Sequence, residues 1–290
     1  MEPKAHITRG LGGSKVNHSR DQKSITKRIL ITVMLLYLAL FLLVPLIFIF
    51  VKAFEQGAAV YFAAITESDA LSAIKLTLLV VAITVPLNTV FGIAAAWCIT
   101  KFQFRGKQLL LSLIELPFAV SPVIAGLIFI LLFNPRSAVG SLFMDWGIKI
   151  IFSTPGIIIV TMFVTLPFIA RELIPIMQTQ GKAEEEAAIS LGASGWQMFI
   201  RITLPTIKWG LLYGMILCSA RAIGEFGAVS VVSGRIRGMT NTMPLHVEIL
   251  YNEYQFAAAF AVASLMSLLA LATLIIKSFI EYKTEKQVGE

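Results

Sequence analysis

Two oppositely charged residues, four positions apart, interrupt an otherwise uncharged stretch of the sequence. Trp209–Gly234 contains Arg221 and Glu225 as its only charged residues. If this stretch is one helix, Arg221 lies about 18 Å along a length of about 39 Å, with Glu225 on the same face. Ionisable side chains inside long apolar segments are costly and point to function. The pair is either structural and self-neutralising, or Arg221 supplies positive potential to a passing anion while Glu225 limits trapping.

A second apolar stretch, Gln108–Phe133, combines one charge with two prolines. Its only charged residue, Glu115, lies about 10 Å from the start of the stretch, as a carboxylate on a pathway or one bonded to a neighbouring helix. Pro117 and Pro122 each remove a backbone donor and predict breaks in the helix. A broken helix at membrane depth must face protein or a water-filled cavity. Ser121 and Pro122 are therefore candidates for a pathway wall or gate, with a simple kink as the alternative.

Composition excludes several classes of protein. Of 290 residues, 57% are hydrophobic and 14% are charged, with a mean hydropathy of +0.81. An ordinary soluble domain carries about a quarter charged residues, and disordered chains are poor in apolar ones. The three histidines are scattered and the two cysteines lie in apolar runs, so neither a metal site nor a cofactor is expected. The net charge of +7 resides at the edges of apolar blocks, which argues against nucleic-acid binding.

The apolar blocks predict an all-α polytopic membrane protein with six transmembrane helices. A bilayer core about 30 Å thick requires about 20 apolar residues of helix. Six runs meet this length without the alternation of a β-barrel strand. They are Ile29–Val51, Leu76–Thr100, Gln108–Phe133, Ile150–Ala170, Trp209–Gly234 and Tyr254–Ile276.

Basic residues predict the orientation and the boundaries of the parts. Sixteen Lys and Arg residues fall on the side of the two termini and five on the opposite side, which places both termini in the cytosol. Residues 1–28 are expected to be a disordered basic cytosolic tail, and 29–51 the first transmembrane helix. Residues 70–280 are expected to be one membrane domain, and 281–290 a cytosolic C-terminal tail.

The longest cytosolic connection, between the fourth and fifth runs, carries strong local signals. Lys182–Leu191 is rich in helix formers, and Glu184–Glu186 would lie in the first turn, where the helix dipole favours anions. Gly192 is placed to end this helix in a left-handed conformation. Ser194 followed by Gln197 predicts a capping box that begins a second helix. Two short helices with a glycine stop between them form a rigid cytosolic knob.

The same connection resembles the coupling loop of bacterial ATP-binding-cassette (ABC) importer permeases. That loop has the pattern Glu-Ala-Ala, three residues, Gly, nine residues, Ile, one residue, Leu-Pro. The pattern is filled here by Glu186, Ala187, Ala188, Gly192, Ile202, Leu204 and Pro205. The resemblance implies that an ATPase subunit contacts this loop, through Glu185, Glu186, Ala187, Ala188, Gly192, Leu204 and Pro205. Pro205 also suits the first turn of the following span.

Three further segments, Leu116–Leu127, Arg171–Pro175 and Arg221–Gly234, resemble the sulfate/thiosulfate permease family, W type rather than T type. The resemblance implies a type I ABC importer permease fold with a cytosolic coupling helix, in a bacterial inner membrane. It also implies a heterodimer with a T-type permease, two ATP-binding subunits, a sulfate-binding protein outside, and membrane lipid around the spans. Molybdate permeases share the portion Gly224–Ala228, so molybdate, tungstate or another oxyanion is the alternative cargo.

ATP chemistry is not expected from this chain itself. A nucleotide-binding loop is rich in glycine and ends in Gly-Lys followed by Ser or Thr. Gly10–Lys15 is rich in glycine and ends in lysine, but it lacks this spacing. The chain is therefore predicted to be a non-catalytic subunit, not an enzyme. On the outer side, Arg235–Glu253 combines aromatic and charged residues, which suits either contact with a binding protein or a plain connector.

Overall fold

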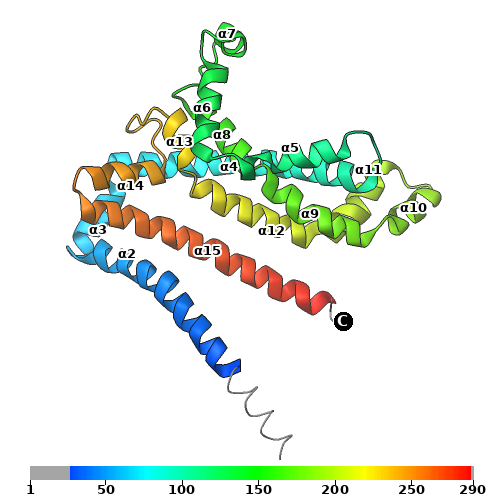
Figure 1. Cartoon of the computed structure of the whole chain (residues 1–290), viewed down its shortest axis with the longest axis horizontal. Coiled ribbons are helices and arrows are strands. Elements are labelled where there is room, and N and C mark those ends of the chain that lie inside the picture. Colours follow the sequence, from blue (N-terminus) through cyan, green and yellow to red (C-terminus); the bar gives the residue numbers. More distant parts are fainter. Residues whose placement is uncertain (1–26, 289–290) are drawn as a thin grey trace, which may run out of the picture. The chain divides into compact units, whose positions relative to one another are not determined.

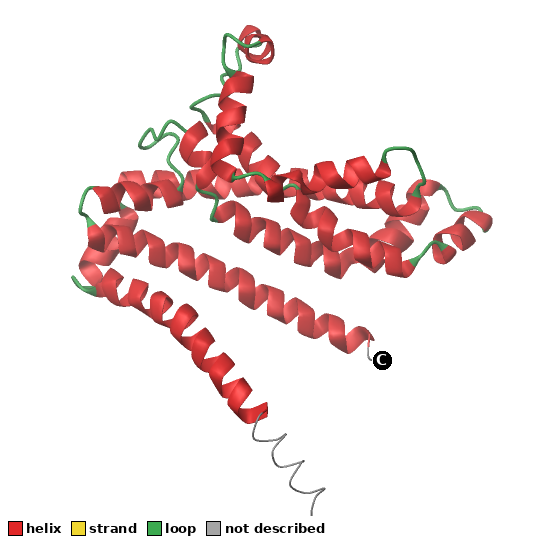
Figure 2. Ribbon diagram, viewed as in Figure 1, coloured by secondary structure: helices red, strands yellow, loops and turns green. Residues whose placement is uncertain are grey.

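The computed structural model describes residues 27–288, and all its regular elements in that range are helices (Figure 2). The basic tail expected at residues 1–28 lies almost wholly outside the described residues. The chain divides into two units between Val51 and Lys52. The first unit consists of the helix that begins at Lys27 and includes a π-helical turn, η1 (Ala39–Leu43), followed by α2 (Val44–Phe54), which continues across the boundary.

The second unit contains the helices that form the membrane domain. In chain order they are α3 (Ala58–Thr66), α4 (Ser68–Lys101), α5 (Lys107–Ala119), α6 (Pro122–Phe133), α7 (Ala138–Asp145), α8 (Thr154–Thr165), α9 (Pro167–Gln180), α10 (Ala183–Ser190), α11 (Gly195–Met198), η2 (Phe199–Thr203), α12 (Leu204–Ile223), α13 (Gly227–Val232), α14 (Met243–Asn252) and α15 (Phe256–Val288). Most of the C-terminal tail expected at 281–290 thus continues α15 as helical backbone.

Five helices of the described range are long and apolar enough to cross a membrane, and one bent pair supplies a sixth. The five are Lys27–Phe54, Ser68–Lys101, Thr154–Gln180, Gly195–Ile223 and Phe256–Ser278. The expected all-α polytopic class with six spans is confirmed. The helices begin earlier or end later than the uncharged runs, because a helix satisfies its own backbone and can continue past charges into the aqueous layers.

Gln108–Phe133 is not one continuous helix, because α5 and α6 meet at 109°. Ser121, between them, has ψ 132°, and Pro122 begins α6. A residue before proline is disfavoured in the α region, and proline suits the first turn of a helix. Pro117 does not break α5, which ends two residues later, so only its last turn loses a bond. After the bend, α6 projects from the bundle with α7 at its end (Figure 1).

One of the core clusters of the second unit forms where α4, α9 and α12 pack together. Its buried side chains are Val85, Ala96, Ile169, Leu173, Met177, Ile207 and Cys218. A Cβ added at Gly92 would lie 2.6 Å from Ile169 Cγ2, and one at Gly214 would lie 3.2 Å from Ile169 Cα. Small residues at these two positions let the helices approach closely, as in other membrane bundles.

The junction between α8 and α9 is a proline break that a neighbouring helix repairs. The Leu166 N–H binds the Phe163 carbonyl, three residues back, which leaves the Met162 carbonyl without its helical partner. Asn88 of α4 is fully buried and donates from Nδ2 to Met162 O at 3.1 Å. In an apolar medium a freed carbonyl must be satisfied by the protein itself, so Asn88 makes the break tolerable.

Candidate coupling site and substrate pathway

The knob expected from the sequence is present, and α10 ends as expected. Gly192 has φ +91°, in the left-handed region that favours glycine. The Gly192 N–H donates to Ile189 O at 2.9 Å, and the Ala193 N–H donates to Ala188 O at 3.0 Å. These two bonds form a Schellman motif and satisfy the last carbonyls of α10. The chain direction after α10 therefore depends on the conformation of one glycine.

The second helix of the knob begins at the predicted capping box. Ser194 Oγ accepts from the Gln197 N–H at 3.3 Å, and Gln197 Oε1 accepts from the Ser194 N–H at 3.0 Å. This helix then runs without a stop from Gly195 to Ile223. Pro205 lies in the first turn of α12, as expected, but η2 joins α11 to α12 through a π-type bond from the Leu204 N–H to Phe199 O. The knob is thus rigidly continuous with a transmembrane helix.

The residues of the expected ATPase contact do not all face outward. Glu186, Ala187, Gly192 and Pro205 are exposed, Ala188 and Leu204 are half-buried, and Glu185 is only 6% exposed. The sequence reasoning missed three large apolar side chains on the knob's surface, Ile189, Leu191 and Trp196. Exposed apolar groups that cluster together are typical of interaction sites. The outer surface of the knob therefore combines carboxylates with apolar groups.

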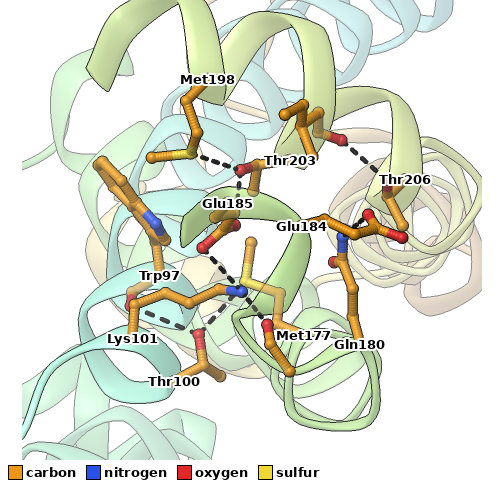
Figure 3. Close-up of polar contacts among 12 residues, drawn as sticks. Trp97, Thr100, Lys101, Met177, Gln180, Glu184, Glu185, Met198, Thr203 and Thr206 are labelled. Atoms are coloured by element: carbon orange, nitrogen blue, oxygen red, sulfur yellow. Dashed lines mark hydrogen bonds and ion pairs between the residues drawn. The ribbon is translucent and has the colours of Figure 1, made fainter. Parts of the chain in front are cut away.

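Glu185 points inward, to a buried cluster that the sequence did not reveal (Figure 3). Its Oε2 lies 3.0 Å from Lys101 Nζ, at the end of α4, and the side chains of both residues are less than one-tenth exposed. Lys101 Nζ also donates to Gly181 O at 2.5 Å. Thr203 Oγ1, from η2, donates to Glu185 Oε1 at 2.7 Å. Lys101 follows a long apolar run and looks like an ordinary flanking charge, so no local pattern indicated its partner.

Arg221 and Glu225 form the expected ion pair, with Nη1 2.6 Å from Oε2. The expectation that both lie on one continuous helix is wrong, because α12 ends at Ile223 and Glu225 follows the end. Arg221 thus lies in the last turn of α12, where its charge complements the helix dipole. Glu225 Oε1 also accepts from the Ala228 N–H at 3.0 Å, in the first turn of α13. Glu225 is 2% exposed, so this carboxylate joins the two helices at a buried break.

The break between α12 and α13 lies against the break between α5 and α6. A Cβ added at Gly227 would lie 3.1 Å from Pro122 Cβ, and one at Gly126 would lie 2.8 Å from Ala228 O. Gly227 therefore serves close packing of α13 on α6. Ser121 and Pro122 are thereby brought to the same part of the fold as the Arg221–Glu225 pair.

Glu115 lies in a different setting, together with a second arginine. It is exposed and lines an open cavity of about 460 Å³ with Ser112, Leu116, Phe118, Ala119 and Arg171. The Arg171 guanidinium lies 5.3 Å from the centre of the Phe118 ring. Glu115 is thus grouped with Arg171, a residue that sequence reasoning did not select for the pathway.

The segment Arg235–Glu253, expected on the outer side, is more ordered than a plain loop, because it includes α14. Arg235 Nη1 lies 3.3 Å from Glu248 Oε2, and Arg237 forms an ion pair with Glu253. His246 is buried, and burial lowers the pKa of its imidazole, which leaves the ring uncharged near pH 7. This end of the bundle, with α3 and α14, lies opposite the end that carries α10 (Figure 1).

Comparison with known proteins places the chain in a family. The model for "Binding-protein-dependent transport system inner membrane component" matches residues 88–286. "Sulfate transport system permease protein CysW" of Escherichia coli K12 is 51% identical over 261 residues, covering 90% of each chain. The Synechocystis protein of the same name is 51% identical over 258 residues, covering 89% of this chain and 94% of the relative. "Sulfate transport system permease protein CysT" of E. coli K12 is 34% identical over 232 residues, covering 80% of this chain and 84% of the relative.

The fold also matches solved structures. A chain from the crystal structure of a bacterial ABC transporter that imports the acidic polysaccharide alginate superposes with a TM-score of 0.71. The match covers 92% of this chain and 99% of the other at 20% identity, so it establishes the fold alone. With the two-helix knob, the six candidate spans and relatives about half identical along nine-tenths of its length, the chain belongs to the family of inner-membrane components of binding-protein-dependent transport systems, and within it to the CysW type.

Proposed function

We propose that this chain is the CysW-type permease subunit of an ATP-driven importer of sulfate and thiosulfate. Two observations together carry the proposal. The chain has a rigid knob at one end of the bundle, and it is about half identical to sulfate permeases along 90% of its length. The knob supplies a place for an ATPase to act, and the spans beyond it supply the passage. The chain itself is the non-catalytic part, and hydrolysis of ATP belongs to a separate subunit.

The complete importer has four further components in this proposal. A CysT-type permease forms a heterodimer with this chain, which is itself 34% identical to a CysT protein. Two ATP-binding subunits dock on the knobs, and a sulfate-binding protein delivers the anion from the other side. The exposed Glu186, Leu191 and Trp196 fit a partner that offers basic and apolar groups.

The proposed orientation rests on the distribution of charge. In the predicted arrangement of the spans, the side assigned to the termini and to the connection between the fourth and fifth runs holds most of the basic residues, which favours the cytosol. The α3–α14 end of the bundle then faces outward, toward the binding protein.

The test of the function is uptake by the reconstituted complex. The chain, with its CysT-type partner, ATP-binding subunit and sulfate-binding protein, is placed in liposomes that contain ATP. Labelled sulfate should accumulate inside, thiosulfate should compete, and liposomes containing ADP serve as the control. Uptake of molybdate without uptake of sulfate would contradict the proposal.

Contact between the outer end and the binding protein is tested by crosslinking. Asn252, at the end of α14, is exposed, so a cysteine there should crosslink to the binding protein. A cysteine at Thr240, 3% exposed, is the matched control and should not react. Crosslinks that form from Ser137 or Met144 but never from Asn252 would move the docking surface to α7.

A further inference from the structure

We infer that Lys101 is a positioning residue for energy coupling: its ion pair with Glu185 holds α10 against the end of α4, so that movement of the knob reaches the transmembrane helices. The inference rests on the proposed function, because it assumes that an ATPase acts on the knob. It gives a role to a lysine that the sequence marked only as a flanking charge.

Lys101 holds the corner between α9 and α10 at two points. Nζ lies 3.0 Å from Glu185 Oε2 and donates to Gly181 O at 2.5 Å. Gly181 is the turn residue that separates α9 from α10, and Glu185 lies in the first turn of α10. One side chain at the end of α4 therefore fixes both the start of α10 and the turn that leads into it.

The second oxygen of Glu185 is held from another direction. Thr203, fully buried in η2, donates to Glu185 Oε1 at 2.7 Å. Since η2 belongs to the continuous helix Gly195–Ile223, Glu185 joins α10 to that helix as well as to α4. The contacts of its carboxylate thus reach two transmembrane helices (Figure 3).

Glycines with positive φ flank both ends of α10. Gly181 has φ +72° and Gly192 has φ +91°, and a Cβ added at either would meet no atom within 4 Å. Glycine permits a wide range of backbone angles, so hydrogen bonds and not side-chain packing at these two positions must fix the direction of the chain. A buried ion pair contributes little net stability but can specify one arrangement of the parts it joins. The direction in which α10 leaves α9 therefore depends on the Lys101–Glu185 pair.

The test separates positioning from stability through a doubly neutral variant. Lys101→Met alone would leave the Glu185 carboxylate buried without its cation, and the cost of that buried charge can impair assembly whether or not Lys101 positions α10. Lys101→Met combined with Glu185→Gln removes both charges, and this variant is expected to assemble. Lys101→Arg keeps the charge, and Lys182→Met removes an exposed lysine next to α10 as the matched control.

Two quantities are measured on the reconstituted complex: sulfate taken up per ATP hydrolysed, and hydrogen exchange of the amides of residues 183–190. In the doubly neutral variant we expect uptake per ATP to fall roughly tenfold, within the range of measured coupling free energies, and the α10 amides to exchange faster. Lys101→Arg and Lys182→Met should stay close to the parent protein in both. A doubly neutral variant that couples normally, or one with unchanged exchange in α10, would overturn the inference.

Failure of the proposed function would look different. If the parent complex takes up no sulfate, the function is wrong, but the exchange of α10 amides still reports whether Lys101 positions the knob. If the parent transports sulfate and α10 is unaffected by the loss of both charges, the function stands and the role of Lys101 does not.

Discussion

Replacement of Arg221 by alanine is expected to lower sulfate uptake at least about tenfold, because the anion loses its source of positive potential at the break between α12 and α13. At an effective dielectric constant of about 20, two unit charges about 4 Å apart interact by about 4 kcal/mol. Glu225 offsets part of the attraction between Arg221 and the anion, because its Oε2 lies 2.6 Å from the guanidinium. Solvent weakens the attraction further, because the Arg221 side chain is 32% exposed. About 1.4 kcal/mol of the interaction is enough for a tenfold effect.

The single variant needs a companion, because Glu225 is buried and would be left without its cation. Glu225→Gln keeps an oxygen that can accept from the Ala228 N–H and so preserves the start of α13. The double variant Arg221→Ala/Glu225→Gln should therefore assemble and hydrolyse ATP at the basal rate, yet take up little sulfate. Arg105→Ala, which removes an exposed arginine between α4 and α5, is the matched control.

Uptake by the double variant decides between the two readings of the pair. If the variant assembles and transports sulfate at the parent rate, the ion pair serves only to join α12 to α13. The passage would then have to be sought elsewhere, and the cavity beside Arg171 and Glu115 becomes the next place to test.

The sequence predicted the fold class and the knob because both depend on local signals. The lengths of the apolar runs in the sequence predict the membrane spans directly. Gly192 predicts the end of α10, and the capping box at Ser194 predicts the start of the next helix. These features are set by residues within a few positions of each other, so no knowledge of distant contacts is needed.

Features that depend on distant contacts were missed or misplaced. The buried pair of Lys101 and Glu185 forms only because α4 and α10 meet in the folded chain. Taking uncharged runs as spans also misplaced the start of the helix that contains Arg221, which begins at Gly195, because a helix can continue past charged residues. The pairing of Arg221 with Glu225 was predicted, but from a helical spacing that the structure does not have.

The change with the largest expected effect is Gly192→Val, which should abolish uptake while the chain still inserts and assembles. A residue with a Cβ loses about 1–2 kcal/mol in the left-handed region, and a β-branched one is excluded more strongly. No atom lies within 4 Å of a Cβ added at Gly192, so the effect must come from the backbone and not from a clash.

Valine at this position can relieve its strain only by leaving the φ of +91°. That rotation breaks the bonds from the Gly192 and Ala193 N–H groups to Ile189 O and Ala188 O, and it turns α10 away from the helix that begins at Gly195. Gly195→Val is the matched control, since Gly195 is on the same knob, has room for a Cβ and has no positive φ. Uptake of labelled sulfate by both variants, with the ATP-binding subunit present, is the measurement. If Gly192→Val takes up sulfate as well as Gly195→Val and the parent protein do, the direction of the chain at Gly192 does not matter for coupling. The proposed docking of an ATPase on α10 would then have to be abandoned.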